Sequence, residues 1–218
     1  MNSVKIKTPR VKKKRAAYHH GDLRQQLLNA TEQIILERGV DGFTLREAAR
    51  RVGVSPAAPA HHFKDARGLL TEVAALGFRD FGDALEAADK EGGSDPAERL
   101  RLQASAYVRF ALQHPARFQL MFRSDKLDAG NAEFSRVSQR AYRVLDGAIH
   151  AATRTPAERE LAPESRGLLL AVWSIVHGFS HLVLEWQLRA PGSESVSKEV
   201  ALKTLLPQML KYLPVKGV

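Results

Sequence analysis

The sequence predicts an all-α protein of nine helices, with a compact three-helix unit near the N-terminus and a six-helix remainder. Apolar residues recur every three or four positions along nearly every segment, and no segment shows the alternation of a strand. Capping residues, glycines and prolines stand where such helices would begin and end. With 218 residues, 44% of them hydrophobic, the chain can bury a sizeable core.

The first helix is expected over Asp22–Arg38. Asp22 and Gln25 fit a capping box, and Gly39 supplies the stop. One apolar stripe runs along this helix, formed by Leu23, Leu27, Ala30 and Ile34.

The second and third helices are expected to be short. The second begins at Thr44, whose hydroxyl can cap the amide of Glu47 while Glu47 reaches back, and it ends before Gly53. The third has Ser55 as its N-cap and Pro56 as its first residue, because proline has no amide proton to leave unpaired there.

The remaining helices follow a long one predicted over 65–90, which the linker-like loop 92–96 closes. We therefore divide the chain into an arm (1–17), a three-helix unit (18–64) and a larger helical part (65–218). The further helices are predicted over 96–113, 115–122, 131–153, 163–189 and 196–213.

The formal charge of +9 is concentrated in the N-terminal third of the chain. Residues 1–67 carry 14 basic and 6 acidic side chains, whereas residues 68–218 are close to neutral. The first 15 residues hold seven basic side chains and no acid, which is typical of a disordered basic arm. This asymmetry predicts a polyanionic partner for the N-terminal part alone.

Several functional classes are excluded by what the sequence lacks. It has no cysteine, which excludes disulfides, Cys-ligated zinc, iron–sulfur clusters and a thiol nucleophile. It also has no Gly-rich phosphate loop, no G-x-S-x-G elbow and no HExxH helix, so we expect neither an enzyme nor a cofactor or metal. No apolar run follows the basic N-terminus, and the apolar stretch 167–184 contains Ser174, His177 and His181, which are costly in lipid. We therefore expect a cytoplasmic protein with no membrane partner.

Residues 44–56 form a helix-turn-helix pattern. Ala48 and Ala49 are small where two helices must cross closely, and Gly53 allows the turn. A helical hairpin without any role in nucleic-acid binding has the same local pattern, but the charge asymmetry favours the nucleic-acid interpretation. The apolar residues that would hold the crossing are Leu45, Val52 and Val54.

Four segments carry a resemblance to a known family: YHHGDLR (18–24), GVDGFTLREAA (39–49), GVSPAA (53–58) and HF (62–63). They resemble the DNA-binding domain of the TetR (tetracycline-repressor) family of bacterial regulators. Trp173 and the pair His177-Gly178 are similar to a W…HG signature in the C-terminal domain of one TetR subgroup, whose N-terminus tends to read YHHGDLR.

The resemblance implies a homodimer that places one recognition helix per subunit, here about 55–61, in successive major grooves of a pseudo-palindromic operator. Pro59 and Ala60 replace the family's usual leucine and tyrosine, and alanine replaces a usual lysine after Phe63, so Lys64 or Arg67 is expected to take over a phosphate contact. The candidate DNA-binding residues are Thr44, Arg46, Ser55, Pro56, Ala57, Ala60, His61, His62, Lys64 and Arg67, together with Lys12, Lys13, Lys14 and Arg15 of the arm.

The segment 163–189 is apolar around most of its circumference, which a single packing face cannot cover. Burial on two sides, against its own subunit and against a partner, agrees with the dimerisation through the last two helices that the resemblance implies. Each residue could equally belong to the intramolecular core. The candidate interface residues are Leu168, Val172, Ile175, Phe179, Leu182, Leu202, Leu205 and Met209.

His177, His181 and Glu185 are spaced to lie on one helix face, which leaves three interpretations open: a metal site, buried histidines with partners, or polar anchors of a ligand pocket. The candidate pocket residues are Phe78, Phe81, Tyr107, Phe110, Phe118, Met121, Phe122, Tyr142, Trp173, His177 and His181.

Together these patterns predict a sequence-specific DNA-binding regulator, a ligand-responsive repressor that binds its operator as a homodimer and a small-molecule effector through its C-terminal part. The alternatives are a nonspecific architectural DNA-binding protein and a metal-responsive sensor that uses His177 and His181.

Overall fold

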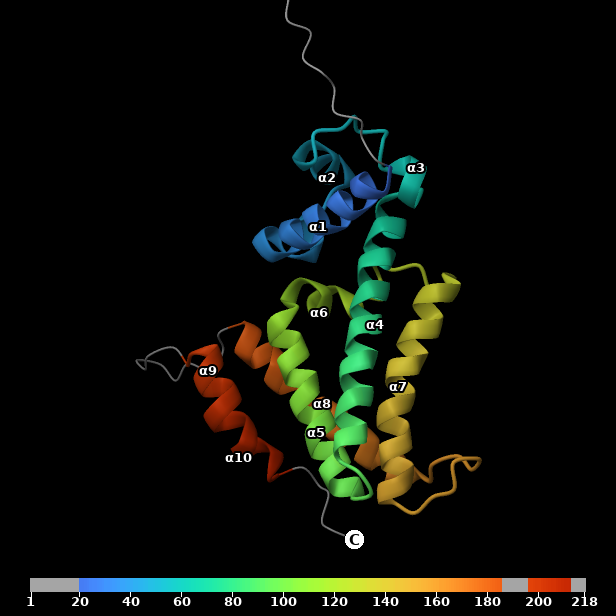
Figure 1. The fold of residues 1–218 in the computed structure, drawn as a ribbon, viewed down its shortest axis with the longest axis vertical. Helices are drawn as coiled ribbons and strands as arrows, with labels where there is room; N and C mark the ends of the chain where they lie inside the picture. Colours follow the sequence, from blue (N-terminus) through green and yellow to red (C-terminus); the bar gives the residue numbers. More distant parts are fainter. Residues whose placement is uncertain (1–19, 186–195, 213–218) are drawn as a thin grey trace, which may run out of the picture.

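A computed structural model describes residues 20–185 and 196–212, and within these ranges the chain is helical with no strand (Figure 1). The predicted all-α class is confirmed. Helices α9, η2 and α10 follow one another without a break, so the described residues form the nine predicted helices and one additional 3₁₀ turn, η1. The elements are α1 (His20–Arg38), η1 (Val40–Gly42), α2 (Leu45–Arg51), α3 (Ala60–Phe63), α4 (Ala66–Glu91), α5 (Pro96–Gln113), α6 (Pro115–Met121), α7 (Ala132–Ala152), α8 (Pro163–Leu184), α9 (Lys198–Val200), the π-helical η2 (Ala201–Leu205) and α10 (Leu206–Leu210).

Helices α1, α2 and α3 form a head at one end of the molecule, and the other helices form a body beneath it (Figure 1). The long helix α4 begins in the head and continues through the body, where it packs against α5, α6 and α7. Helix α8 packs against α5 and α7, and α10 lies against α5.

Two hydrophobic cores stabilise this arrangement. The first contains Leu27 and Ile34 of α1 together with Val73 of α4 and Leu120 of α6, all of them buried. The second lies in the body, between α4, α5, α6, α7 and α8, and Phe118 of α6 is among its fully buried members. Because α4 and α6 contribute to both cores, head and body share part of their packing.

The predicted cap of α2 is half confirmed. The Thr44 hydroxyl accepts a hydrogen bond from the Glu47 amide at 3.2 Å, as expected. The reciprocal bond is wrong, because the Glu47 carboxylate binds Arg50 and Arg51 instead. In α1, Gln25 likewise donates to the Asn29 side chain at 2.9 Å rather than acting in a capping box.

The predicted third helix is shorter than expected. Residues 56–59 form turns, and α3 begins only at Ala60. Pro59 has no amide proton to donate to the Ser55 carbonyl, which instead accepts from the Ala58 amide at 3.0 Å in a tighter three-residue step. Ser55 is therefore not the N-cap of an α-helix.

The last two helices also differ in their bounds. Helix α8 ends at Leu184, and the predicted extension over 186–189 lies outside the described residues, as does residue 213. The final helix begins at Lys198, where the Ser197 hydroxyl accepts from the Val200 amide, and it widens to π-helical geometry over Ala201–Leu205. Pro207 follows this widened turn and cannot donate the hydrogen bond that a regular α-helix would need there.

A substitution at Gly68 tests the close packing of α3 against the start of α4, where the head joins the body. A Cβ at Gly68 would lie 2.0 Å from the backbone carbonyl oxygen of Phe63, and backbone cannot move aside cheaply. We expect Gly68→Ala to lower the free energy of unfolding by about 1–3 kcal/mol, as overpacking does elsewhere, in urea denaturation.

Gly147 provides the matched control, because it is exposed within α7 and a Cβ there meets nothing within 4 Å. Gly147→Ala should raise the unfolding free energy by up to about 1 kcal/mol, because alanine is the better helix former. Equal effects of the two substitutions would contradict the close approach at Gly68.

Candidate functional site

The helix-turn-helix presents most of its predicted DNA contacts to solvent. His62 is partly buried, with its ring centroid 6.1 Å from that of Phe63. The four arm residues Lys12, Lys13, Lys14 and Arg15 lie outside the described residues. The exposed candidates are Thr44, Arg46, Ser55, Pro56, Ala57, Ala60, His61, Lys64 and Arg67.

Glu47 organises the arginines of α2. It accepts hydrogen bonds from Arg50 at 2.7 and 2.8 Å and from Arg51 at 3.1 Å, and these bonds, Arg50 first, lower the pKa of its carboxyl to about 2. Arg51 also binds Glu37 of α1, which joins the two helices. By contrast, no ion pair or hydrogen bond joins Arg46 to another described side chain, so its guanidinium is available to a phosphate.

Arg67, one of the two residues predicted to contact a phosphate, also makes hydrogen bonds within the protein. Its guanidinium donates to the backbone carbonyls of Leu127 at 2.8 Å and Asp125 at 3.2 Å, in the loop between α6 and α7. The interaction fixes the start of α4 to this loop and leaves Lys64, which is exposed with a φ of +66°, as the cation nearer to α3.

Further ion pairs connect the head to α6. Arg117 donates to Glu32 of α1 at 2.9 Å and to Asp80 of α4 at 2.6 Å. Just beyond α6, Arg123 and Lys126 bind Asp41 of η1 at distances of 2.7–3.1 Å. Hydrogen bonds from Arg123, and then from Lys126, lower the pKa of the Asp41 carboxyl to about 2.

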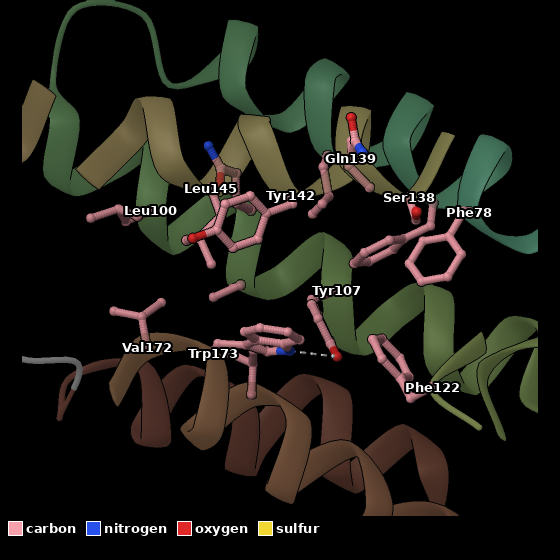
Figure 2. A pocket seen from close by; sticks show the side chains of 16 residues that line it. Phe78, Leu100, Tyr107, Phe122, Ser138, Gln139, Tyr142, Leu145, Val172 and Trp173 are labelled. Atoms are coloured by element: carbon pink, nitrogen blue, oxygen red, sulfur yellow. Dashed lines mark hydrogen bonds between the residues drawn. The ribbon is translucent and has the colours of Figure 1, made fainter. Parts of the chain in front are cut away.

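A cavity of about 310 Å³ lies in the body, between α4, α5, α7 and α8. Its wall is almost wholly apolar, and Figure 2 shows Tyr142 of α7 facing Trp173 of α8 across it, with ring centroids 6.5 Å apart. The lining residues are Phe78, Phe81, Leu85, Leu100, Gln103, Ala104, Tyr107, Phe122, Ser138, Gln139, Ala141, Tyr142, Leu145, Val172, Trp173 and Val176.

The structure brings six of the eleven predicted pocket residues to this wall: Phe78, Phe81, Tyr107, Phe122, Tyr142 and Trp173. The other five do not line it. Phe110, Phe118 and Met121 are buried in the body core, and Phe118 packs against both histidines, His177 and His181. Three of these five residues, Phe110, Phe118 and His177, have rings that pack against lining residues and form a second layer behind them.

A chain of hydrogen bonds joins the wall to that second layer. The Trp173 indole donates to the Tyr107 hydroxyl at 3.4 Å, and the hydroxyl lies 2.7 Å from Nδ1 of His177 (Figure 2 shows the first of these bonds). Burial, and then the neighbouring His181, lower the pKa of His177, whereas burial raises the pKa of Tyr107. Both groups are therefore neutral, and the Tyr107 hydroxyl donates a hydrogen bond to His177 in the tautomer whose Nδ1 carries no proton.

The histidine face does not collect the ligands of a metal centre. His181 contacts Glu185 at 3.3 Å, while His177 turns to Tyr107. Within residues 20–185 and 196–212, no group of three or more His, Cys, Asp or Glu side chains is placed to hold a metal ion.

The outer face of α8 carries exposed apolar side chains, with Leu170 53% and Leu182 45% exposed. Of the predicted interface residues, Val172 is wrongly placed, because it is 2% exposed in the single chain and lines the cavity. The remaining interface candidates are partly buried: Leu168, Ile175, Phe179, Leu202, Leu205 and Met209.

By length and mean hydropathy α8 could cross a membrane, but core helices of soluble proteins pass the same test.

Ten of the lining residues were not predicted from the sequence, although helical spacing was a signal for some of them. Leu100, Gln103 and Ala104 precede Tyr107 by seven, four and three positions, so they share its face of α5. The other missed residues are Leu85, Ser138, Gln139, Ala141, Leu145, Val172 and Val176, of which Val172 had been assigned to the interface.

Two family models match the chain and together cover more than half of it. Residues 27–73 match "Bacterial regulatory proteins, tetR family", and residues 100–205 match "Tetracyclin repressor-like, C-terminal domain". The fold and the exposed helix-turn-helix define a bacterial regulatory protein of the helix-turn-helix class. The chain belongs to the TetR family.

Curated relatives match little more than a third of the chain. The transcriptional regulator BetI of Stenotrophomonas maltophilia is 35% identical over 78 residues, and BetI of Serratia proteamaculans is 37% identical over 81 residues. These matches cover 36% and 37% of this chain, and the chain spans about 40% of the length of each relative.

Solved structures match nearly the whole chain. A protein of unknown function from Rhodococcus sp. RHA1 is 29% identical, with a TM-score of 0.67 over 92% of this chain and 99% of the other. The TetR family regulator PfmR of Thermus thermophilus (21% identical, TM-score 0.63, covering 89% and 96%) shares the fold. So does AibR, solved with isovaleryl coenzyme A and operator DNA (15% identical, TM-score 0.61, covering 85% and 97%).

The partly buried His177 makes stability depend on pH, because burial and the neighbouring His181 lower its pKa. Because the pKa of folded His177 lies below its ordinary 6.5, His177 stabilises the fold above about pH 6.5 and loses this contribution as the pH falls through the lowered value. In His177→Gln the amide oxygen can still accept from Tyr107 but does not titrate. We expect its unfolding free energy to fall less between about pH 7.5 and pH 5.5 than that of the wild type, measured by urea denaturation.

His150 gives the opposite sign as a control. Hydrogen bonds to the backbone carbonyls of Arg159 and Asp146 raise its pKa, so its contribution is present below pH 6.5 and is lost as the pH rises. His150→Gln should therefore lose more stability at pH 5.5 than at pH 7.5. A His177→Gln profile parallel to that of the wild type would contradict the neutral, accepting role of His177.

Proposed function

We propose that this protein is a cytoplasmic, ligand-responsive transcriptional repressor that binds a pseudo-palindromic operator as a homodimer. One observation carries the proposal: a single chain holds an exposed helix-turn-helix and, in a separate hydrophobic core, an apolar cavity of about 310 Å³. Neither the residues of the head nor those of the cavity wall form a catalytic arrangement, whereas a DNA-reading head and an effector cavity form a complete regulator.

The head supports DNA binding through two kinds of contact. Arg46 and Lys64 are exposed cations that can bind phosphates and set the register of the head on the duplex. Pro56, Ala57 and Ala60 expose small apolar surface suited to thymine methyl groups, and the neighbouring His61 is a polar group able to reach a base edge.

The cavity supports effector binding. A pocket of this kind pairs apolar walls with few polar groups, and this one adds six aromatic side chains. AibR was solved in one complex with isovaleryl coenzyme A and operator DNA, so a protein of this fold holds both kinds of partner.

Helix α6 provides the connection between effector and operator. Phe122, directly after α6, lines the cavity, whereas Arg117 on the same helix binds Glu32 in the head. An occupant that displaces Phe122 moves the segment to which the head is attached. A coupling of about 1–3 kcal/mol, usual for allosteric proteins, is enough to change operator affinity between about five- and 150-fold.

The outer face of α8 supports the homodimer. Leu170 and Leu182 expose apolar surface, and the positions between them on this face, Ser174 and Gly178, are small enough for a second helix to approach closely. We expect two copies of α8 to pack here, together with the helix formed by α9, η2 and α10.

The first experiment is a footprint of the purified protein on the intergenic DNA beside its own gene, against scrambled competitor at near-physiological salt. We expect a protected palindrome. Arg46→Ala should weaken binding to all sequences and reduce the slope of log affinity against log salt by about 1, because one phosphate contact is lost. Arg143→Ala, which removes an exposed arginine of α7, is the matched control and should change neither quantity.

Deletion of residues 1–15 separates the regulator from the architectural alternative. In a regulator we expect the deletion to lower affinity uniformly and to keep the preference for the palindrome, because the arm would add phosphate or minor-groove contacts while the helix-turn-helix reads the sequence. Loss of all binding, or salt-sensitive binding without any preference in the intact chain, would contradict the proposal.

The dimer is tested by charging the α8 face. Leu182→Lys places an ammonium in the expected interface and should weaken self-association at least about tenfold, as measured by light scattering across a dilution series. Leu36→Lys alters an equally exposed leucine of α1 and should leave the dimer intact. An unchanged mass for Leu182→Lys would exclude this face.

A further inference from the structure

Gln103 of α5 is a buried polar residue in the wall of the apolar cavity, and it is 3% exposed. Its amide nitrogen donates to the Asp89 carboxylate at 2.6 Å and approaches the Val144 carbonyl at 3.5 Å. Asp89 in turn accepts two bonds from Arg99, each 2.7 Å long. Helices α4, α5 and α7 thus hold one amide group between them.

These contacts determine the orientation of the Gln103 amide group. A carboxylate and a carbonyl oxygen only accept hydrogen bonds, so the nitrogen of Gln103 must face Asp89 and Val144. The amide oxygen Oε1 is therefore the end of this wall residue that these contacts leave without a donor. A flipped amide would set oxygen against the Asp89 carboxylate.

Among the buried side-chain nitrogen and oxygen atoms of the described residues, Gln103 Oε1 alone has no hydrogen-bond partner. The other buried polar groups of the wall satisfy one another: Trp173 donates to Tyr107, and Tyr107 binds His177. A buried acceptor without a donor is costly, and a donor brought by a ligand recovers that cost.

The rest of the wall limits the ligand further. None of the sixteen lining residues is Asp, Glu, Lys, Arg or His, so a charged group would lose its hydration without gaining an opposite charge. The volume of about 310 Å³ is at the small end of ligand pockets, which span about 300–1,000 Å³. Six aromatic side chains favour flat rings packed between them.

We propose that the cavity takes an uncharged, mainly apolar ligand of about two rings that carries one hydroxyl or N–H donor, and that this donor binds Gln103 Oε1. The inference rests on the proposed function, since it names the chemical class of the effector.

Four probes with one skeleton test it by calorimetry on the full-length chain: 2-naphthol, 2-methoxynaphthalene, naphthalene and 2-naphthoate. The naphthol should bind at least about tenfold more tightly than naphthalene or the methoxy compound, because it alone is a neutral donor. The charged naphthoate should bind most weakly.

Gln103→Met keeps the length of the side chain and removes the acceptor, so the preference for naphthol over naphthalene should disappear while naphthalene still binds. Retained naphthalene binding shows that the variant is folded. Ser138→Ala is the matched control, because it removes another polar group of the wall, one that already donates to the Ser135 carbonyl, and it should keep the preference.

Equal affinities in the wild type, a preference that survives in Gln103→Met, or no binding of any probe would overturn the inference. None of these results bears on operator recognition. A protein that protects its palindrome yet shows no preference for the naphthol contradicts the donor proposal alone, whereas a protein without a specific DNA site contradicts the proposed function.

Discussion

The sharing of helix α4 between two hydrophobic cores is the constraint on which the rest of this structure depends. Val73 packs with α1 in the head, and Phe81, two turns further along the same helix, packs in the body and lines the cavity. Packed cores resist small changes in volume, so a shift of α4 at Phe81 cannot be absorbed within the body alone. The head must follow, because its own core includes the first turns of α4.

The ion pairs around α6 also connect the head to the body, at the surface of the molecule. Arg117 connects α1 to α4 through Glu32 and Asp80, and Arg67 fixes the start of α4 to the loop that follows α6. Exposed ion pairs contribute little to stability on their own, commonly about 0–1 kcal/mol each. Arg117 is only 16% exposed, however, and it bridges three helices, so its role is to hold one relative position of head and body. When α6 moves, such ion pairs can exchange partners, and the exchange costs little free energy.

The sequence allowed the fold to be predicted because most of its signals are local. Periodic apolar residues mark every long helix, and the Thr44 cap depends on a bond across only three positions. The predictions that failed depended on distant contacts or on two nearby signals in competition. At the third helix, Pro56 suits a first helical position, but Pro59 three residues later removes the bond that would close that turn. The bond from Arg67 to the carbonyl of Leu127 was not predicted, because no local pattern indicates a partner 60 residues away.

The same reasoning explains why only six of the sixteen lining residues were predicted. Tyr107 and Phe110 are both aromatic residues of α5, yet only Tyr107 lies on the face toward the cavity. Which face that is depends on how α5 crosses α4 and α8, and the sequence of α5 alone does not contain this information. Gln103 shares the face of Tyr107 one turn earlier, so the polar group of the wall could be found once the face was known.

Helix α8 lies between the cavity and the proposed dimer face. A ligand in the cavity and a partner subunit could therefore affect each other through this one helix. Val172, Trp173 and Val176 line the cavity from one side of the helix, while Leu170 and Leu182 are exposed on the other. A helix is only about 10–12 Å across with its side chains, so an occupant of the cavity lies one helix diameter from the proposed dimer face. Helix α8 packs mainly on α5 and α7. In the proposed dimer, a ligand that rotates α8 would change the angle between the two subunits, whereas a ligand that moves α6 would change the angle of the head within one. Both movements would alter the spacing of the two recognition segments in that dimer, and the cavity is lined both by α8 and by Phe122, directly after α6.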